Sequence, residues 1–319
     1  MTLAYLPRLF CVSMAAFFLL HSALGLAVAL LSPGAVRAAQ RMSSRSAARL
    51  LLTLRLLPAG FGLFAVAAFC IPSYCRLEPD AGAESVSFGF LAAALLGLAI
   101  WIVSLTRACS AAGRSLRYVR QCVGRNTRLA GPRCEIWLVE APVPVLALAS
   151  ILRPRLLISK NVVNALSEDE LGAVLDHERA HRASYDNAKR LALLLAPGLL
   201  PFYSGFGALD RNWARFAEWA ADDRAVAGNP LRSVSLAAAL VRVARLGLAT
   251  PALMSSFADR RDLPARVDRL LRTAPRREPR APRVAPLVAG AALAAALLAA
   301  ALQPAATASV YLLLERLVH

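Results

Sequence analysis

Long apolar runs and clusters of arginine alternate along the chain. A helix that crosses the hydrocarbon core of a bilayer needs about 20 mainly apolar residues, and four runs reach this length. The predicted spans are Leu9–Leu31, Leu50–Ile71, Ser87–Thr106 and the alanine-rich Val284–Leu302. Arg55 lies near one end of the second span, where its side chain is expected to snorkel to the membrane surface. The pattern predicts a mainly α-helical, multi-pass membrane protein.

The charges of the loops predict how these spans are oriented. The chain is 58% apolar and has a formal net charge of +17, with arginines clustered after the first and third spans and before the last. Since basic loops stay on the cytoplasmic side, we expect the N-terminus and the short C-terminal tail outside and residues 107–283 in the cytoplasm. The arginine clusters adjoin spans and few aromatic residues interleave with them, so no direct nucleic-acid partner is expected.

Three parts of the chain follow from this layout. Residues 1–106 form three transmembrane helices with short loops, residues 107–283 form the cytoplasmic domain, and residues 284–319 form the final helix and outer tail. Cys70 and Cys75 lie at the outer end of the second span, where a disulfide between them is left open.

The cytoplasmic part combines short strands with longer helices. Strand-like runs occupy 135–139, 143–148 and 155–159, with prolines between them that suit turns and edge strands. The following stretch, LSEDELGAVLDHERAHR, reads as a helix. Ser167 and Glu170 have the spacing of a capping box at its start. A small α+β domain is predicted, and His177 and His181 project from one face of its helix.

The stretch HERAH has the spacing H-E-x-x-H. Two imidazoles four residues apart on a helix can bind one Zn²⁺. Glu178 beside the first histidine can act as the general base, taking a proton from the attacking water and passing it to the leaving amine. The alternative is a solvated helix face, but His177 and His181 are two of only four histidines in the chain.

A catalytic zinc needs a third protein ligand, and the cytoplasmic part has no further histidine. The predicted helix RFAEWAADDRAVAG offers Glu218, with Asp222 four residues later. Glu218 is the favoured ligand, and Asp222 would hold a ligand histidine by a hydrogen bond. Asp186 and Glu170 remain alternative ligands, although Asp186 is expected to hold the helix end in place.

Residues 191–209 are apolar enough to resemble a further span. A single crossing would separate His181 from Glu218, and the prolines and glycines of this segment would break a straight helix. The segment is therefore expected to be a hairpin, a re-entrant segment or an interfacial wall beside the zinc site.

The stretches RPRLLIS, LSEDELGAVLDHERAHRASYDN and EWAADDRAV together resemble the Bla-R/Mec-R-type antirepressor membrane zinc peptidases, which are gluzincins. The HtpX-like proteases and CaaX prenyl proteases share the H-E-x-x-H and the later E-x-x-x-D. The resemblance implies zinc bound by His177, His181 and Glu218, with Glu178 as the catalytic base. It also gives Arg266, in LPARVDRLL, a supporting role near the site.

The family resemblance implies a zinc metalloendopeptidase of the bacterial inner membrane that cuts a cytoplasmic or membrane-proximal protein. A transcriptional repressor is the substrate that the family suggests. No S-x-x-K follows the final predicted span, so a penicillin-binding sensor domain is not expected. An HtpX-like quality-control protease and a catalytically silent signal transducer remain alternatives; the intact ligand set and Glu178 favour an enzyme.

Overall fold

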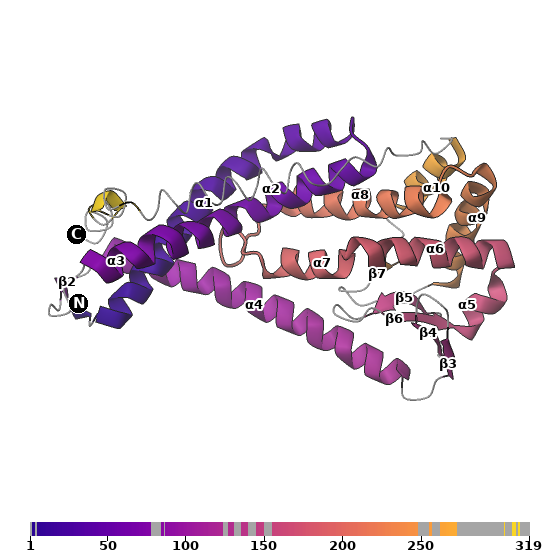
Figure 1. Cartoon of the computed structure of the whole chain (residues 1–319), viewed down its shortest axis with the longest axis horizontal. Coiled ribbons are helices and arrows are strands. Elements are labelled where there is room, and N and C mark those ends of the chain that lie inside the picture. Colours follow the sequence, from indigo (N-terminus) through magenta and orange to yellow (C-terminus); the bar gives the residue numbers. More distant parts are fainter. Residues whose placement is uncertain are drawn as a thin grey trace.

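The protein is described from a computed structural model. It describes residues 5–77, 87–123, 155–247 and 262–272, with short stretches at 2–3, 84–85, 127–130, 135–139, 145–149, 255–256, 303, 308–310 and 312. The predicted fourth span, Val284–Leu302, lies outside the described residues. Within them the fold is mainly helical, as expected, with long apolar helices and a small sheet near the opposite end of the molecule (Figure 1).

Three helices of the described residues are long and apolar enough to cross a membrane. They are α1 (Tyr5–Ala39), α2 (Ser44–Ala65) with its continuation through the π-helical turn η1 (Val66–Cys70) and α3 (Ile71–Leu77), and α4 (Phe88–Val123). They cover the first three predicted spans, except that Ser87 lies one residue before α4. Two-residue strands β1 (Thr2–Leu3) and β2 (Glu84–Ser85) pair antiparallel at the end opposite the sheet (Figure 1). Cys70 and Cys75 are free thiols.

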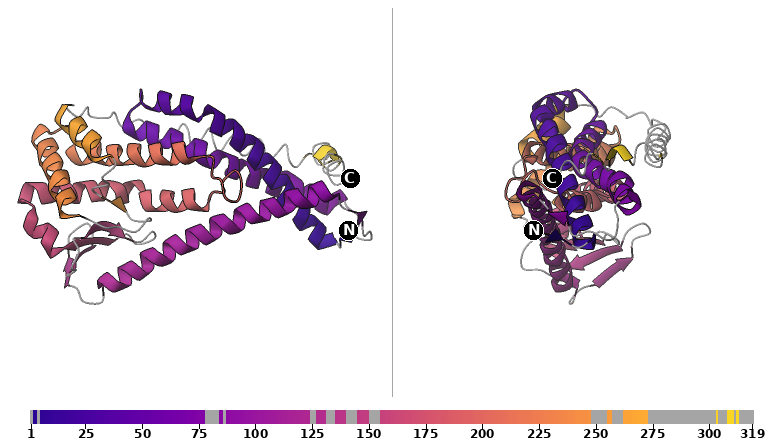
Figure 2. Two further views of the ribbon diagram at one scale, coloured as in Figure 1. Left: turned by 180° about the vertical axis from the view of Figure 1, so that it is seen from behind. Right: turned by 90° about the vertical axis from the view of Figure 1, so that its left-hand side faces the viewer.

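Helix α4 links the apolar helices to the sheet (Figure 2). Its 36 residues extend about 54 Å, whereas the hydrocarbon core of a bilayer is about 30 Å thick. The helix is therefore longer than a crossing requires. Its second half carries Arg114, Arg117 and Arg120, all exposed, which suits a segment outside the hydrocarbon.

The sheet has the strand order β3-β4-β6-β5-β7, in which only the β4–β6 pair is parallel. Its strands are β3 (Thr127–Ala130), β4 (Glu135–Val139), β5 (Leu146–Ala149), β6 (Arg155–Ser159) and β7 (Ser255–Ser256). The predicted strands at 135–139 and 155–159 are confirmed. The middle one begins at residue 146, two positions after Pro144, a residue that has no N–H to donate to a ladder.

Helices pack on this sheet and on one another around an apolar core. They are α5 (Lys160–Ala165), α6 (Glu168–Ser184), α9 (Pro230–Leu246) and α10 (Leu263–Arg272). The core includes Leu156 and Ile158 from β6, Val174 from α6, and Leu236 and Leu240 from α9. This core fixes α6, the helix that carries both candidate histidines.

Two helices form a hairpin that lies against the apolar helices. They are α7 (Asp186–Leu195) and α8 (Gly207–Val226), and the turn 196–206 between them reverses the chain. Leu199 and Phe206 pack so tightly on α1 that a Cβ at Gly25 would lie 2.6 Å from the Leu199 side chain. Residues 191–209 thus contain a reversal of direction, and they are not part of a candidate span among the described residues.

Arg55 does not snorkel, so that prediction is wrong. Its side chain is 2% exposed and donates hydrogen bonds to the carbonyl oxygens of Leu193, Ala196 and Pro197 at 3.4, 3.0 and 3.3 Å. Its Nε also pairs with Asp210 at 3.1 Å. The carbonyls at the end of α7 have no partner within the helix and carry partial negative charge, so they attract the guanidinium inward.

Candidate metal centre

Helix α6 begins with the predicted capping box. The Ser167 hydroxyl accepts a hydrogen bond from the Glu170 backbone N–H at 3.3 Å, and the Ser167 N–H donates to the Glu170 carboxylate at 2.9 Å. The apolar face of the helix, with Ala173 and Val174, packs in the core. His177 and His181 face α8 one turn apart, and only 0% and 1% of their surfaces are exposed.

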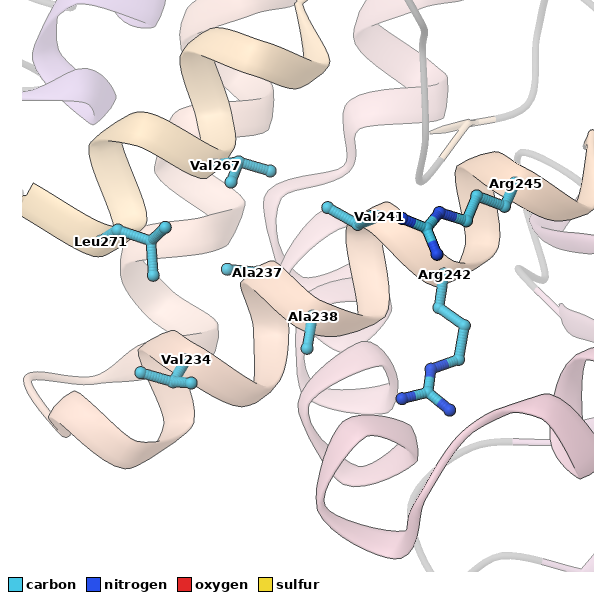
Figure 3. A pocket seen from close by; sticks show the side chains of 8 residues that line it. All are labelled: Val234, Ala237, Ala238, Val241, Arg242, Arg245, Val267 and Leu271. Atoms are coloured by element: carbon cyan, nitrogen blue, oxygen red, sulfur yellow. The ribbon is translucent and has the colours of Figure 1, made fainter.

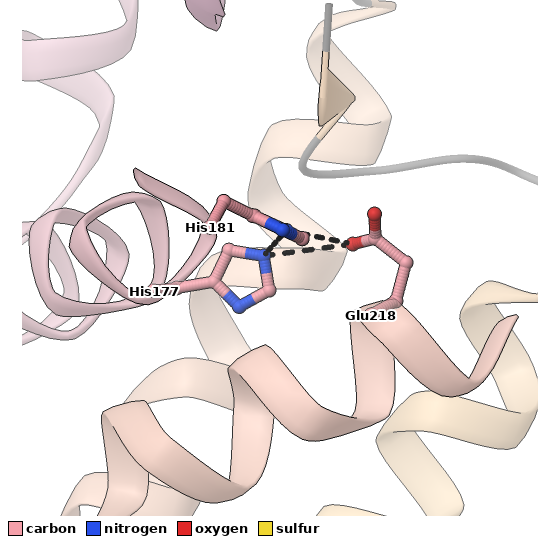
Figure 4. Close-up of side chains that lie close together, drawn as sticks. All are labelled: His177, His181 and Glu218. Atoms are coloured by element: carbon pink, nitrogen blue, oxygen red, sulfur yellow. Dashed lines mark hydrogen bonds and ion pairs between the residues drawn. The ribbon is translucent and has the colours of Figure 1, made fainter. Parts of the chain in front are cut away.

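Glu218 on α8 completes a triangle of ligand atoms with the two histidines (Figure 4). The Nε2 atoms of His177 and His181 are 3.1 Å apart, and each lies 3.5 Å from Oε2 of Glu218. Ligands about 2.05 Å from a tetrahedral zinc are separated from one another by about 3.3 Å. The triangle therefore has the size that a zinc ion requires, and the residues present fit the metal.

The outward-facing nitrogen of each histidine contacts a carboxylate. Nδ1 of His177 lies 3.0 Å from Oδ1 of Asp222, and Nδ1 of His181 lies 2.7 Å from Oδ2 of Asp186. A proton on Nδ1 leaves the lone pair of Nε2 directed at the centre of the triangle. Each aspartate therefore lies where it could hold an imidazole in the orientation that a metal requires.

Asp186 reaches His181 because the chain bends sharply between α6 and α7. Tyr185 has a left-handed backbone with φ of 57°, which ends α6, and Asp186 begins α7 immediately afterwards. A left-handed backbone at a tyrosine costs about 1–2 kcal/mol. The bend places a carboxylate five residues after His181 beside its ring, which a continued helix would not do.

Two arginines hold the carboxylates of the site. Arg266, 1% exposed, forms two hydrogen bonds with Asp222, at 2.9 and 2.6 Å, and its Nη1 lies 3.2 Å from Oε2 of Glu218. Arg190 on α7 donates to the other oxygen of Glu218 at 3.1 Å. Sequence reasoning missed Arg190. Its position four residues after Asp186, on the same face of a helix, was the available signal.

The charges of this network shift several pKa values. Burial raises the pKa of Asp222, but the charge of Arg266 and the contact with His177 outweigh it and lower that pKa to about 2. Burial also opposes ionisation of Glu218, and His181, His177 and Arg266 still hold its pKa well below the usual range. Burial lowers the pKa of His181, and Glu218 and Asp186 together raise it to about 10. Glu218 and Asp222 are thus ionised at neutral pH, the state in which a carboxylate acts only as an acceptor.

Glu178 and Glu170 are the other two predicted site residues on α6. Glu178 lies on α6 between the two histidines, with 1% of its surface exposed, and interacts electrostatically with Arg266. Glu170, the alternative ligand, is held instead by the capping box and by Arg242 at 3.2 Å. The contact network contains these predicted residues: His177, His181, Glu218, Asp222, Asp186 and Arg266.

A groove on the outer face of α9 and α10 offers no comparable chemistry (Figure 3). Alanine, valine and leucine side chains line it, together with the guanidinium groups of Arg242 and Arg245. The residues lining it that the structure describes include neither a carboxylate nor an imidazole. It is therefore not a candidate catalytic site.

Residues 120–257 match the model of peptidase family M48. The matched range contains both histidines and Glu218 and ends before Arg266. The protease HtpX homolog of Archaeoglobus fulgidus is 30% identical over 147 residues, which are 45% of this chain and 40% of that protein. The alignment thus spans less than half of the relative. With the three candidate spans, these matches support a membrane metallopeptidase; the Bla-R/Mec-R subtype stays a prediction.

Proposed function

We propose that this protein is a zinc metalloendopeptidase of the membrane. The triangle formed by two Nε2 atoms and one carboxylate oxygen carries the proposal, since its sides of 3.1, 3.5 and 3.5 Å suit a tetrahedral ion. The M48 match over residues 120–257 supports the same chemistry.

His177, His181 and Glu218 are the proposed metal ligands. When bound, zinc would supply a Lewis acid that polarises the scissile carbonyl. Glu178 is the proposed base: it takes a proton from the attacking water and delivers it to the leaving amine. Asp222 and Asp186 keep the two imidazoles in the tautomer that ligates metal, and Arg266 holds Asp222 in place.

The proposed topology places the peptidase domain in the cytoplasm of a bacterial cell, at the inner membrane, with the N-terminus outside. A contact between distant parts supports it: Ser44, at the start of α2, donates to Asp223 on α8 at 2.9 Å. The arginine-rich loop before α2 and the peptidase domain therefore lie at one end of the spans. Basic loops mark the cytoplasmic side.

The proposed substrate is a cytoplasmic or membrane-proximal protein. A regulator such as a transcriptional repressor is one substrate that the sequence resemblance suggests, and a substrate of membrane quality control is the other. The similarity to a protease HtpX homolog supports protease activity. A catalytically silent transducer is the contrasting possibility. It would not require a buried carboxylate such as Glu178 beside the metal ligands.

Metal content and turnover of matched variants separate an active peptidase from a silent transducer. Purified protein should hold about one zinc per chain, and His177→Ala should lose it. Glu178→Gln should retain zinc while turnover falls about 100- to 10,000-fold. Asp176→Asn, a neighbouring change on the outer face of α6, is the matched control. Comparing new protein N-termini in cells with the native chain and with Glu178→Gln would identify the substrate. Full turnover in Glu178→Gln would refute the mechanism.

A further inference from the structure

A second pocket, of about 280 Å³, lies between α2, the α6–α7 junction and α8. Helices α2 and α8 run antiparallel along it, since Ser44 contacts Asp223 at one end and Arg55 contacts Asp210 at the other. The metal triangle is close by, because Asp186 both lines this pocket and holds His181.

The lining changes character along the length of the pocket. Arg45 and Arg49 on α2 and Arg224 on α8 lie toward the Ser44 end, whereas Leu52 on α2 and Trp213 on α8 lie toward the Arg55 end. Arg45 and Leu52 are seven positions apart, which corresponds to about 10 Å along a helix. The pocket is thus cationic at one end and apolar about 10 Å away.

This polarity matches the direction of the candidate span. Helix α2 enters its apolar run after Arg49, so the arginines lie at the membrane surface and Leu52 lies deeper. A phospholipid in the same leaflet has its phosphate at the surface and its acyl carbons below. The cationic end of the pocket therefore lies at the depth of the lipid phosphate, and the apolar end lies at the depth of the first acyl carbons.

The charge of the lining selects an anion. Four cationic side chains line the pocket, Lys189 in addition to the three arginines, and the described lining contains one carboxylate, that of Asp186. That carboxylate is already paired with Lys189 at 2.8 Å and with His181 at 2.7 Å. Guanidinium groups form paired hydrogen bonds with phosphate oxygens, so the arginine end suits a phosphate group.

We propose that this pocket binds the headgroup phosphate of an anionic phospholipid from the leaflet on the peptidase side. The arginine end takes the phosphate, and Leu52 and Trp213 contact the first carbons of the acyl chains. The bound lipid would then lie against the junction that holds His181. The proposal concerns lipid binding alone and does not depend on the metal chemistry.

The test measures lipids retained by the full-length protein in detergent, by native mass spectrometry, during titration with phosphatidylglycerol or phosphatidylcholine. The native chain should retain one phosphatidylglycerol in preference to phosphatidylcholine. Each basic residue at an anionic surface contributes roughly fivefold to binding, so Arg45→Gln with Arg49→Gln should weaken retention about 25-fold. The pair Arg45→Lys with Arg49→Lys should restore most of it.

The matched control is Arg114→Gln with Arg117→Gln, which removes two exposed arginines from the basic part of α4, outside the pocket. It should leave the preference intact; an equal loss would mean general surface attraction and would overturn the pocket. Unchanged retention in the Arg45/Arg49 glutamine variant would also overturn it.

Leu52→Asn should weaken lipid retention several-fold, because it places a polar amide where the acyl carbons would lie. Two results together would show a site for free phosphate and overturn the lipid proposal. In that case millimolar inorganic phosphate displaces the lipid, and Leu52→Asn does not change lipid retention.

Discussion

Arg266 and Arg55 are buried almost equally, with 1% and 2% of their surfaces exposed, but they are neutralised in different ways. Arg266 lies between two carboxylates, Asp222 at 2.6 Å and Glu218 at 3.2 Å, which are themselves 1% and 8% exposed. Arg55 has one carboxylate partner, Asp210, whose side chain is 35% exposed, and three backbone carbonyls.

The difference shows two uses of the same side chain. Arg266 belongs to a charge network closed to water, in which each member depends on the others. Arg55 instead completes the end of a helix, where carbonyl dipoles replace a second counter-ion. The first arrangement holds the carboxylates of the proposed metal site in place. The second fixes the hairpin that carries Asp186 and Glu218 toward the site.

The largest effect is expected from Arg266→Leu. Removing one partner of a buried pair leaves uncompensated charge and costs about 3–5 kcal/mol. Here both Asp222 and Glu218 lose a neighbour, so we expect lower stability together with loss of zinc. Chemical unfolding in detergent and metal analysis of the folded fraction would measure the two effects. Native stability and full zinc content would mean that the closed network is not the support inferred here.

Arg55→Leu should have the next largest effect, confined to the hairpin. Each buried carbonyl left without a donor costs about 1–3 kcal/mol, but Asp210 can be hydrated and the chain can relax, so a total near 3 kcal/mol is expected. Hydrogen exchange should accelerate at residues 193–200 and remain slow in α6. Zinc should stay bound in folded protein. Loss of zinc equal to that of Arg266→Leu would remove the distinction between the two arginines.

The structure brings the proposed metal ligands together, and much of this grouping could be predicted because their spacing is local. His177 and His181 depend on one helical turn, and the capping box that starts their helix is four residues long. Glu218 and Asp222 follow the same rule on a second helix. What the spacing alone did not specify was how close the two helices come, which the core around Val174 determines.

The role of Arg55 could not be predicted in the same way. Its partners lie about 140 residues further along the chain, in a segment whose fold the sequence left open between three forms. Snorkelling is the default for a single arginine near the end of a span. The reversal at 196–206 places carbonyls beside α2, and no local pattern in the sequence specifies that packing. Arg190 was missed for a related reason, since its contact with Glu218 crosses the hairpin.

Arg190→Gln should have a moderate effect that separates metal affinity from folding. Arg190 holds Oε1 of Glu218, while Oε2 faces the histidines. Changing a group that orients a ligand typically weakens metal binding 10- to 100-fold. Because Arg190 is 18% exposed and Arg266 also supports Glu218, we expect the low end, about tenfold. Competition with a zinc chelator would measure it. Unchanged affinity would leave Arg266 as the sole support of Glu218 among the described arginines.

The smallest effect is expected from Arg232→Gln, which tests the same pair of chemical groups outside the core. Arg232 contacts Asp176 at 2.9 Å, a distance similar to that between Arg266 and Asp222, but the two side chains are 53% and 29% exposed. Water already solvates both charges, so such pairs contribute about 0–1 kcal/mol and less at high salt. Asp176 also keeps Arg179 at 2.8 Å. Unfolding at low and high salt should therefore differ little from the native chain. A loss comparable to that of Arg266→Leu would show that contact distance, and not burial, decides what an arginine contributes in this protein.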